Sequence, residues 1–302
     1  MLLLDDALIP QARLRQVVCA GDGLVLDYRD LGPGLRLWSR PAPLERLRKR
    51  LAHALPAGSG PAVVFAGSGD FHHVTPVLLE RAVSAAGGPP VTLVHFDNHP
   101  DWVKFGPGAH CGSWVSLAAR MPQVVRVLTI GVCSNDIRPA AARKADLSAV
   151  ADGRLELYAY GAGPTERTFA VAGRQWPTIE GVGAWAFAHY LPGRIETEAV
   201  YITIDKDVLR PEEAGTNWDQ GRMTAALLEE FLVAATRGRR LIGADVVGDW
   251  SRPRYGGGLA AGLLKRGEAA LDQPWRAPSP EALARNEATN LMLLRLLREA
   301  GA

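Results

Sequence analysis

Short apolar runs alternate with amphipathic segments along most of this chain, and this alternation limits the folds open to it. The strand-like runs, each ending in or followed by polar residues or glycine, lie at 61–70, 91–97, 124–132, 199–207 and 240–250. Segments with apolar residues at helical spacing lie at 44–55, 74–86, 113–121, 224–237 and 286–300. Strands that alternate with helices predict a parallel sheet covered on both faces. The polar residues after the strands should then gather at one edge of the sheet, where open α/β sheets bind ligands.

Two stretches lack this alternation. Residues 152–185 are rich in glycine, and residues 253–280 are poorly periodic, so loops with short elements are predicted in both. Neither stretch resembles a linker, and the sequence has no internal repeat. The whole chain, 1–302, is therefore predicted to form a single domain.

Charge and cysteine content exclude several classes of protein. The formal net charge is only +2 and its signs are mixed, so neither nucleic acid nor a membrane surface is an expected partner. Cys19, Cys111 and Cys133 are widely spaced and form no disulfide framework. The chain begins with acids and a proline where a signal peptide needs a basic start, and no apolar run is long enough to span a membrane. A cytoplasmic protein with a small-molecule substrate is expected.

The segment after the run 91–96 carries the most specific pattern. Asp97, His99 and Asp101 follow one another at a spacing of two residues. Side chains at this spacing in extended backbone point the same way, so all three can converge on one point. Two carboxylates and an imidazole suit a divalent metal ion. A polar loop that caps the next helix is the alternative, but capping does not explain three potential ligands with period two.

Asp205 and Asp207 repeat this arrangement after the run 199–204. Two carboxylates held close together in a crevice repel each other, and the loss of hydration adds to the cost. A metal ion would relieve both costs, whereas an exposed turn after the strand is the alternative. On its own the pair would favour an exposed turn, so a role in metal binding is predicted only together with the motif Asp97, His99 and Asp101.

A third motif, Gly67-Ser68-Gly69-Asp70-Phe71-His72-His73, follows the first strand-like run. Its glycines permit a sharp turn or a close approach to a ligand, and its histidines could bind metal or transfer protons. A phosphate-binding loop is the alternative, but the Lys and the Ser or Thr of that motif are missing.

In their order along the chain, the glycine-rich loop with His, then D-x-H-x-D, then D-x-D, the three motifs resemble those of the arginase/ureohydrolase superfamily, which includes agmatinases, formimidoylglutamases and zinc histone deacetylases. The segments that begin at Gly215 (GTNWDQGRMT), Cys111 (CGSWVS) and Ala244 (ADVV) are similar to further family segments. The resemblance covers roughly residues 60 to 300 and implies a divergent member. It also implies a three-layer α/β/α fold with a central parallel sheet of about eight strands.

Residue by residue, the resemblance implies a pair of metal ions. His72 and Asp101 would bind the first ion, and Asp97 and Asp205 would bridge it to the second. The remaining ligands of the second ion would be His99 and Asp207. Two manganese ions per chain are expected, and another divalent metal would also suit carboxylate and imidazole ligands.

Two cations that share one water lower its pKa, orient it toward a trigonal carbon and stabilise the tetrahedral intermediate. The resemblance thus implies a hydrolase of carbon–nitrogen bonds other than peptide bonds, acting on a guanidino or amidine-type small molecule. The alternatives are an amide hydrolase of the deacetylase type and a non-catalytic metal-binding relative. The full ligand set disfavours both alternatives. The resemblance also allows for a homo-oligomer.

The group that protonates the leaving nitrogen departs from the family pattern. Family members carry a proton-transferring His in the segment H-G-x-P, where this sequence has Cys111, preceded by His110. His110, Cys111 and His73 are therefore the catalytic candidates. For Cys111, the alternative is a small buried residue of the core.

The group that binds a guanidinium also departs from the pattern. Arginases follow the late strand with a Glu, where this chain has Gly248 and then Asp249. Asp249 or Asp219 could supply the carboxylate that a buried guanidinium requires. Thr216 and Trp218 are predicted to contact the substrate with them, and a core role is the alternative for the tryptophan. If neither acid serves, an amide or formimino substrate is expected.

Overall fold

The computed structural model describes residues 1–55, 62–138, 141, 143–163, 165–273 and 279–301. Its centre is a six-stranded parallel sheet with the strand order β4-β12-β11-β5-β7-β8. The strands are β4 (Ala62–Phe65), β5 (Val91–Phe96), β7 (Val124–Val132), β8 (Leu155–Ala159), β11 (Ala199–Asp205) and β12 (Arg240–Val247). The predicted parallel sheet is confirmed. Pro61, with which the first predicted run begins, lies outside the described residues.

The predicted count of about eight strands was too high for this sheet. The other described strands pair only with one another, in three separate two-stranded sheets. They are β1 (Leu2–Leu3), β2 (Leu26–Asp27), β3 (Trp38–Ser39), β6 (Ala109–His110), β9 (Thr168–Val171) and β10 (Arg174–Pro177). The central sheet of the described residues therefore has six strands.

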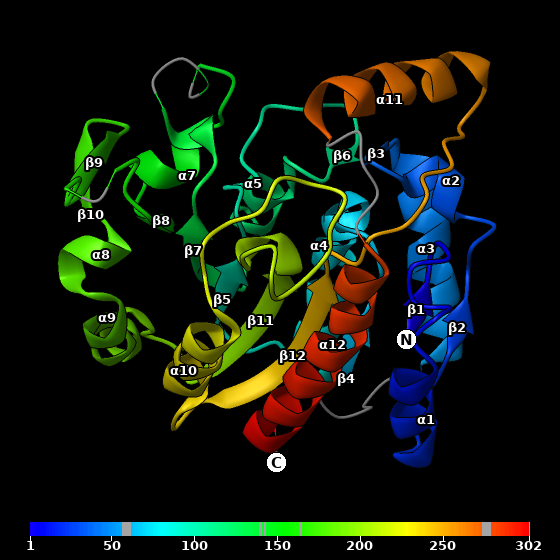
Figure 1. Cartoon of the computed structure of the whole chain (residues 1–302), viewed down its shortest axis with the longest axis horizontal. Helices are drawn as coiled ribbons and strands as arrows, with labels where there is room; N and C mark the ends of the chain where they lie inside the picture. The colour runs from blue at the N-terminus through cyan, green and yellow to red at the C-terminus, as the bar shows by residue number, and fades with distance from the viewer. Residues whose placement is uncertain (56–61, 139–140, 142, 164, 274–278, 302) are drawn as a thin grey trace.

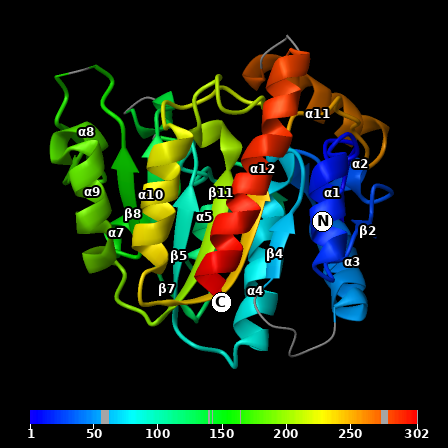
Figure 2. The same cartoon turned by 60° about the horizontal axis from the view of Figure 1, so that its bottom comes forward.

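Helices cover both faces of the sheet, as Figures 1 and 2 show. One face carries α9 (Ala184–Tyr190), α10 (Ala225–Thr236) and α12 (Pro280–Gly301). The other carries α4 (Thr75–Ala85), α5 (Trp114–Ala118) and α7 (Ser148–Ala151). The remaining described helices are α1 (Ala12–Ala20), α2 (Gly32–Leu35), α3 (Pro41–Ala54), α8 (Ile179–Val182) and α11 (Leu259–Asp272). No helix among the described residues is both long and apolar enough to cross a membrane.

Strand β5 divides its side chains between two cores. Val94 and Phe96 belong to the core under α10 and α12, whereas Val91 and Leu93 belong to the core under α4 and α5. Successive side chains of a strand point to opposite faces. His95 therefore points to the same face as Leu93.

Regular elements lie in both stretches that were predicted to be loops with short elements. Strand β8 lies within 152–185 and forms an edge of the sheet. Helix α11 lies within 253–280, of which 274–278 are outside the described residues. The short elements within 152–185 agree with this prediction, whereas the 14-residue helix α11 does not, because its leucines are exposed and do not face the core.

Helix α11 lies across the carboxyl ends of the strands, beside β3 and β6 (Figure 1). Its buried residues are Lys265 and Ala269. Its leucines are exposed, at Leu259, Leu263, Leu264 and Leu271. The helix is instead attached by polar contacts: Lys265 Nζ donates to Gly34 O at 2.9 Å, and Glu268 accepts from Trp38 Nε1 at 3.0 Å.

Candidate metal centre

The six predicted metal ligands follow three strands of the central sheet. His72 lies in the 3-10 turn η1 (Gly69–Val74) after β4, and Asp205 ends β11. Asp97 directly follows β5, which is the neighbour of β11. The carboxyl ends of neighbouring parallel strands meet at one edge of the sheet, so these side chains lie together.

His72 is the centre of the first group of ligands. Its Nδ1 atom lies 3.0 Å from Asp97 Oδ2, 3.3 Å from Asp101 Oδ2 and 3.7 Å from Asp205 Oδ2. His72 and Asp205 are almost fully buried. One imidazole nitrogen thus faces three carboxylates in a site closed to solvent.

His99 is the centre of the second group. Its Nδ1 atom lies 3.0 Å from Asp207 Oδ2 and 3.5 Å from Asp97 Oδ1. Asp97 therefore turns one oxygen toward each group, which is the arrangement required of a carboxylate that bridges two ions. Asp97, His99 and Asp207 form one potential metal site, and His72 with Asp97 and Asp101 forms part of another.

The protonation of His72 supports a metal ligand. Its Nε2 atom lies 2.9 Å from Thr203 Oγ1, and that hydroxyl donates to Asp245 Oδ1 at 2.8 Å. A hydroxyl has one hydrogen to donate, so His72 must donate its own proton from Nε2. This directs the buried Nδ1 atom at the carboxylates of Asp97 and Asp101. Burial opposes protonation, but these carboxylates raise the pKa of His72 and so hold a proton on Nδ1 that a metal ion would replace. A metal ion would satisfy this atom.

His99 is held in the same way by an acid that was predicted to bind substrate. Its Nε2 atom lies 2.9 Å from Asp219 Oδ1, and Asn98 Nδ2 donates to Asp219 Oδ2 at 3.1 Å. The carboxylate accepts the Nε2 proton, so Nδ1 is again directed at the carboxylates of the cluster. Such carboxylate–histidine pairs orient metal ligands.

We expect Asp219→Asn to weaken metal binding by roughly 10- to 100-fold, because the amide no longer fixes the His99 proton on Nε2. Calorimetric titration of the metal-free protein with Mn²⁺ measures this change. Asp152→Asn, at an exposed position far along the chain, is the matched control. Unchanged affinity in Asp219→Asn would show that Asp219 does not orient His99.

The carboxylates of the cluster raise one another's pKa values. Burial and repulsion by Asp97 raise the pKa of Asp205 to about 7 and that of Asp101 to about 6. Burial and the neighbouring Asp205 also raise the pKa of Asp207. Asp97 is the exception: burial opposes its ionisation, but His72, His95 and His99 hold its pKa well below the usual range. A pair of cations would stabilise all of these groups as carboxylates.

Two glycines make room for Asp205. A Cβ atom on Gly69 would lie 2.4 Å from Asp205 Oδ2, and one on Gly248 would lie 2.4 Å from Asp205 Oδ1. Gly248 also has a φ of +93°, which side chains disfavour. The position where arginases carry the guanidinium-binding Glu therefore has no space for a side chain in this fold.

Substitution of Gly248 by alanine is expected to destabilise the protein by about 1–3 kcal/mol and to disturb Asp205. Gly238→Ala is a suitable control, because Gly238 also has a positive φ but a Cβ atom there would meet no other atom within 4 Å. Chemical denaturation of both variants separates the collision from the backbone strain. Equal losses of stability would contradict the proposed contact with Asp205.

His95 was not among the predicted site residues, although it belongs to the buried cluster. Its Nε2 atom lies 2.9 Å from Asp97 Oδ2. The signal was present in the sequence, since His95 precedes Asp97 by two residues and continues the period-two pattern.

The predicted catalytic residues His110 and Cys111 lie beside Asp101. A Cβ atom on Gly112 would lie 3.2 Å from His110 Nδ1 and 3.9 Å from Asp101 Oδ1. His110 Nδ1 accepts from the Gly112 N–H at 2.8 Å, and Nε2 is paired closely with Glu268 of α11. Both ring nitrogens are therefore engaged, and the role of His110 in proton transfer stays a prediction.

Cys111 and His73 are placed as buried neutral groups. Cys111 Sγ lies 3.7 Å from His110 Nδ1, and burial raises the pKa of its thiol well above the ordinary value. This favours the alternative interpretation of Cys111 as a small buried residue of the core. Burial lowers the pKa of His73, and neither of its ring nitrogens has a hydrogen-bond partner in the described structure.

Asp249 is not brought to the cluster. It is fully buried and accepts from Lys206 Nζ at 2.7 Å and from Gln11 Nε2 at 2.7 Å. Removing one partner of a buried ion pair is costly, so Asp249 is expected to stay paired with Lys206 rather than bind a substrate cation. Lys206 points away from the cluster, as expected from its place between two ligands. The placement of Asp249 does not favour contact with substrate.

Thr216 and Trp218 lie in the loop that also carries Asp219. Thr216 Oγ1 donates to Trp218 O at 2.8 Å, which shapes the loop. The Trp218 ring lies 5.8 Å from that of His99, and its Nε1 donates to Asp70 Oδ1 at 2.9 Å. Trp218 therefore borders the candidate metal cluster, and its contact with substrate stays a prediction.

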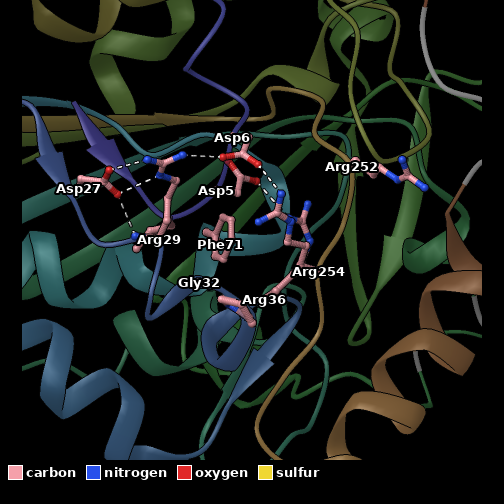
Figure 3. Close-up of a pocket in the computed structure, with 11 residues that line it drawn as sticks. Asp5, Asp6, Asp27, Arg29, Gly32, Arg36, Phe71, Arg252 and Arg254 are labelled. Carbon is pink, nitrogen blue, oxygen red and sulfur yellow. Dashed lines mark hydrogen bonds and ion pairs between the residues drawn. The ribbon is translucent and has the colours of Figure 1, made fainter.

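A separate cavity of about 220 Å³ lies beside Arg36 (Figure 3). Several of its exposed charges are paired: Arg29 contacts Asp6 and Asp27, and Arg254 contacts Asp6. None of the predicted metal ligands lines this cavity. Arg36 links it to the metal site only indirectly, through an ion pair of 2.6 Å with Asp70.

A buried cluster of carboxylates and imidazoles at the carboxyl edge of a parallel sheet is suited to metal binding. Comparison with known proteins identifies the fold. The arginase from Bacillus subtilis is similar with a TM-score of 0.56 at 15% identity, over 97% of this chain and 90% of that one. The formimidoylglutamase from B. subtilis gives a TM-score of 0.53 at 12% identity, over 84% and 64%. The arginase from Entamoeba histolytica gives 0.52 at 13%, over 84% and 74%.

The chain thus has the fold of the arginases and of formimidoylglutamase. No model of a known family matches the sequence. An uncharacterized protein of Thermotoga maritima is 24% identical over 201 residues, which make up 66% of this chain and 62% of that protein. The match therefore spans less than two thirds of that relative's length.

Proposed function

We propose that this protein is a hydrolase with a paired metal centre, which cleaves a non-peptide carbon–nitrogen bond in a guanidino or amidine-type small molecule. Manganese is the proposed metal, because most of the ligands are carboxylates. The observation that carries the proposal is the convergence of all six predicted ligands around Asp97, with His72 Nδ1 and His99 Nδ1 both directed at carboxylates.

A pair of divalent ions, when bound, would activate water and stabilise negative charge on the substrate. The chain's own residues hold the ligands in place for this. Trp114 Nε1 donates to Asp101 Oδ2 at 2.6 Å, and the Asp207 N–H donates to Asp205 Oδ1 at 3.0 Å. The burial of Asp205 and Asp207 excludes bulk water, which strengthens electrostatic stabilisation in the site.

A cationic substrate needs a carboxylate outside the metal cluster. Asp249 is occupied by Lys206, whereas Asp219 stands at the exposed side of the centre, with 60% of its side chain accessible. We propose that a guanidinium or amidinium group approaches along Asp219 and the ring of Trp218. His99, with 17% of its side chain accessible, is the ligand on this side.

A substrate screen tests the proposal. Guanidino, amidino and N-acyl compounds are incubated with the protein and Mn²⁺, and the release of urea, ammonia or amine is measured. Urea or ammonia from a guanidino or amidino compound, lost in Asp205→Ala, is the expected result. Amine release from N-acyl compounds alone would favour the deacetylase-like alternative. Absence of turnover in protein that holds two ions would favour a non-catalytic metal-binding relative.

A further inference from the structure

Helix α11 turns its charged side to the protein and its apolar side to solvent. The side that faces the protein carries Lys265 and Glu268, which contact Gly34 O and Trp38 Nε1. The outer side carries four leucines with exposed fractions of 92%, 66%, 67% and 86%, at Leu259, Leu263, Leu264 and Leu271. A surface helix ordinarily turns its apolar side to the core. The leucines of α11 therefore call for a cover that the described residues of one chain do not supply.

The exposed leucines form a row with a gap in it. Residues four positions apart lie one above the other on a helix, so Leu259, Leu263, Gly267 and Leu271 share one row. The row is centred on position 265, and reversing it exchanges Leu259 with Leu271 and Leu263 with Gly267. A two-fold axis brings the same patch of two copies together. Two antiparallel rows that meet about their midpoints thus place a leucine opposite a glycine.

We propose that α11 is the contact surface between two copies of this chain, which pair antiparallel about the middle of the helix. Leu263 of each copy enters the space beside Gly267 of the other, where a Cβ atom would meet no atom of its own chain within 4 Å. Large side chains that face small ones interdigitate across a helix pair. A two-fold contact of this kind closes on itself, so this surface joins two chains and no more. The pairing does not depend on the proposed function.

The area of the leucine surface fits the centre of such an interface. A leucine side chain carries about 100 Å² of apolar surface, so these four bury roughly 300 Å² in each copy. A stable interface buries about 800 Å² per partner, with an apolar centre and a polar rim. Phe105, 41% exposed, adds apolar surface beside α11, since its ring lies 5.5 Å from that of His110, the partner of Glu268. The leucines supply the centre, and the surfaces around α11 supply the rim.

A membrane surface is the other cover that exposed leucines could have. Helices that lie on membranes carry several Lys or Arg residues on their polar face. In α11 the Lys265 side chain is buried, with its ammonium group on Gly34 O, and Glu268 and Asp272 add negative charge. Arg266 is exposed but is balanced by these acids. The charges of the helix therefore favour a second copy over an anionic lipid surface.

The substitution Gly267→Leu distinguishes the two covers. It favours the helix, because leucine has a higher helix propensity than glycine and the position is open. It also fills the space that Leu263 of the other copy needs, so the dissociation constant of the dimer should rise at least about tenfold. Sedimentation equilibrium of the full chain measures this constant. Leu263→Glu should abolish pairing, whereas the control Leu24→Glu, at a position 48% exposed before β2, should leave it unchanged.

Disulfide crosslinking locates the contact. Chains with Leu263→Cys are mixed with chains with Gly267→Cys under a mild oxidant, both in a Cys19→Ser background because Cys19 is exposed. We expect a covalent dimer that contains one chain of each kind. Leu24→Cys in place of Leu263→Cys should give no such dimer.

A wild-type chain that sediments as a monomer at about 100 μM would overturn the inference. A dimer that survives Leu263→Glu, or one with the same dissociation constant in Gly267→Leu, would also overturn it. Binding of a monomeric wild type to phosphatidylserine vesicles, strengthened by Gly267→Leu, would instead make α11 a membrane-binding helix. None of these results bears on the metal centre, so the proposed function is tested separately.

Discussion

Asp205→Ala is expected to lower turnover by at least about 1,000-fold and to reduce the metal content of the chain. Asp205 is the proposed bridging ligand from β11, and its Oδ2 lies 3.7 Å from His72 Nδ1. The loss of a bridging carboxylate removes a ligand from both ions at once. Turnover is measured with the substrate identified by the screen, and metal content by elemental analysis.

The stability of the metal-free variant distinguishes this effect from misfolding. Asp205 is a buried carboxyl whose pKa is raised to about 7, so its ionised form destabilises the folded chain. Above pH 7, metal-free Asp205→Ala should therefore melt at the same temperature as wild type or higher. The exposed control Asp152→Ala should leave turnover, metal content and melting unchanged. A large loss of stability in metal-free Asp205→Ala would indicate that Asp205 serves the fold rather than the metal.

The metal-free protein is expected to lose stability as the pH rises from about 5 to about 8. The pKa values of Asp101, Asp205 and Asp207 are raised in the folded chain, by burial and by repulsion between carboxylates. Each group binds its proton more tightly when folded, so stability present at low pH is lost as the pH rises through the folded pKa. The raised pKa values of His72 and His99, which contact these carboxylates, act in the same direction. A loss on the order of 2–4 kcal/mol is expected.

Bound metal should abolish this loss of stability between pH 5 and pH 8. Mn²⁺ at about 1,000 times its dissociation constant stabilises the folded chain by about 4 kcal/mol, which amounts to roughly 10 °C in melting temperature. Thermal melts at pH 5 and pH 8, with chelator and with Mn²⁺, measure both effects. In Asp207→Asn the pH dependence without metal should become weaker. Metal-free stability that is constant or rises between pH 5 and pH 8 would contradict the proposed electrostatics of the cluster.

The convergence of the candidate ligands could be predicted from the sequence because their positions depend on local geometry. Asp97, His99 and Asp101 follow one strand at a spacing of two, and Asp205 follows its neighbour in the sheet. Strand ends in a parallel sheet meet at one edge, so the motifs converge without knowledge of any loop. His95 continues the same period-two pattern two residues before Asp97, so the sequence also contained the signal for its place in the cluster.

The surroundings of the ligands could not be predicted, since they depend on contacts between distant segments. The pairing of Lys206 with Asp249 joins residues 43 positions apart, and that of His110 with Glu268 joins residues 158 apart. Helix α11 was not predicted, because its leucines, such as Leu259, are exposed and it is attached to the rest of the structure by polar contacts. The reason for Gly248 also became visible only in the fold, where Asp205 fills the space beside it.

The number and position of bound metal ions test the central claim most directly. Crystals grown with Mn²⁺ and measured at the manganese absorption edge should show two anomalous peaks per chain. One should lie among His72, Asp97 and Asp101, and the other between His99 and Asp207, with Asp97 bonded to both ions. A single peak, or none at saturating Mn²⁺, would contradict the paired metal centre.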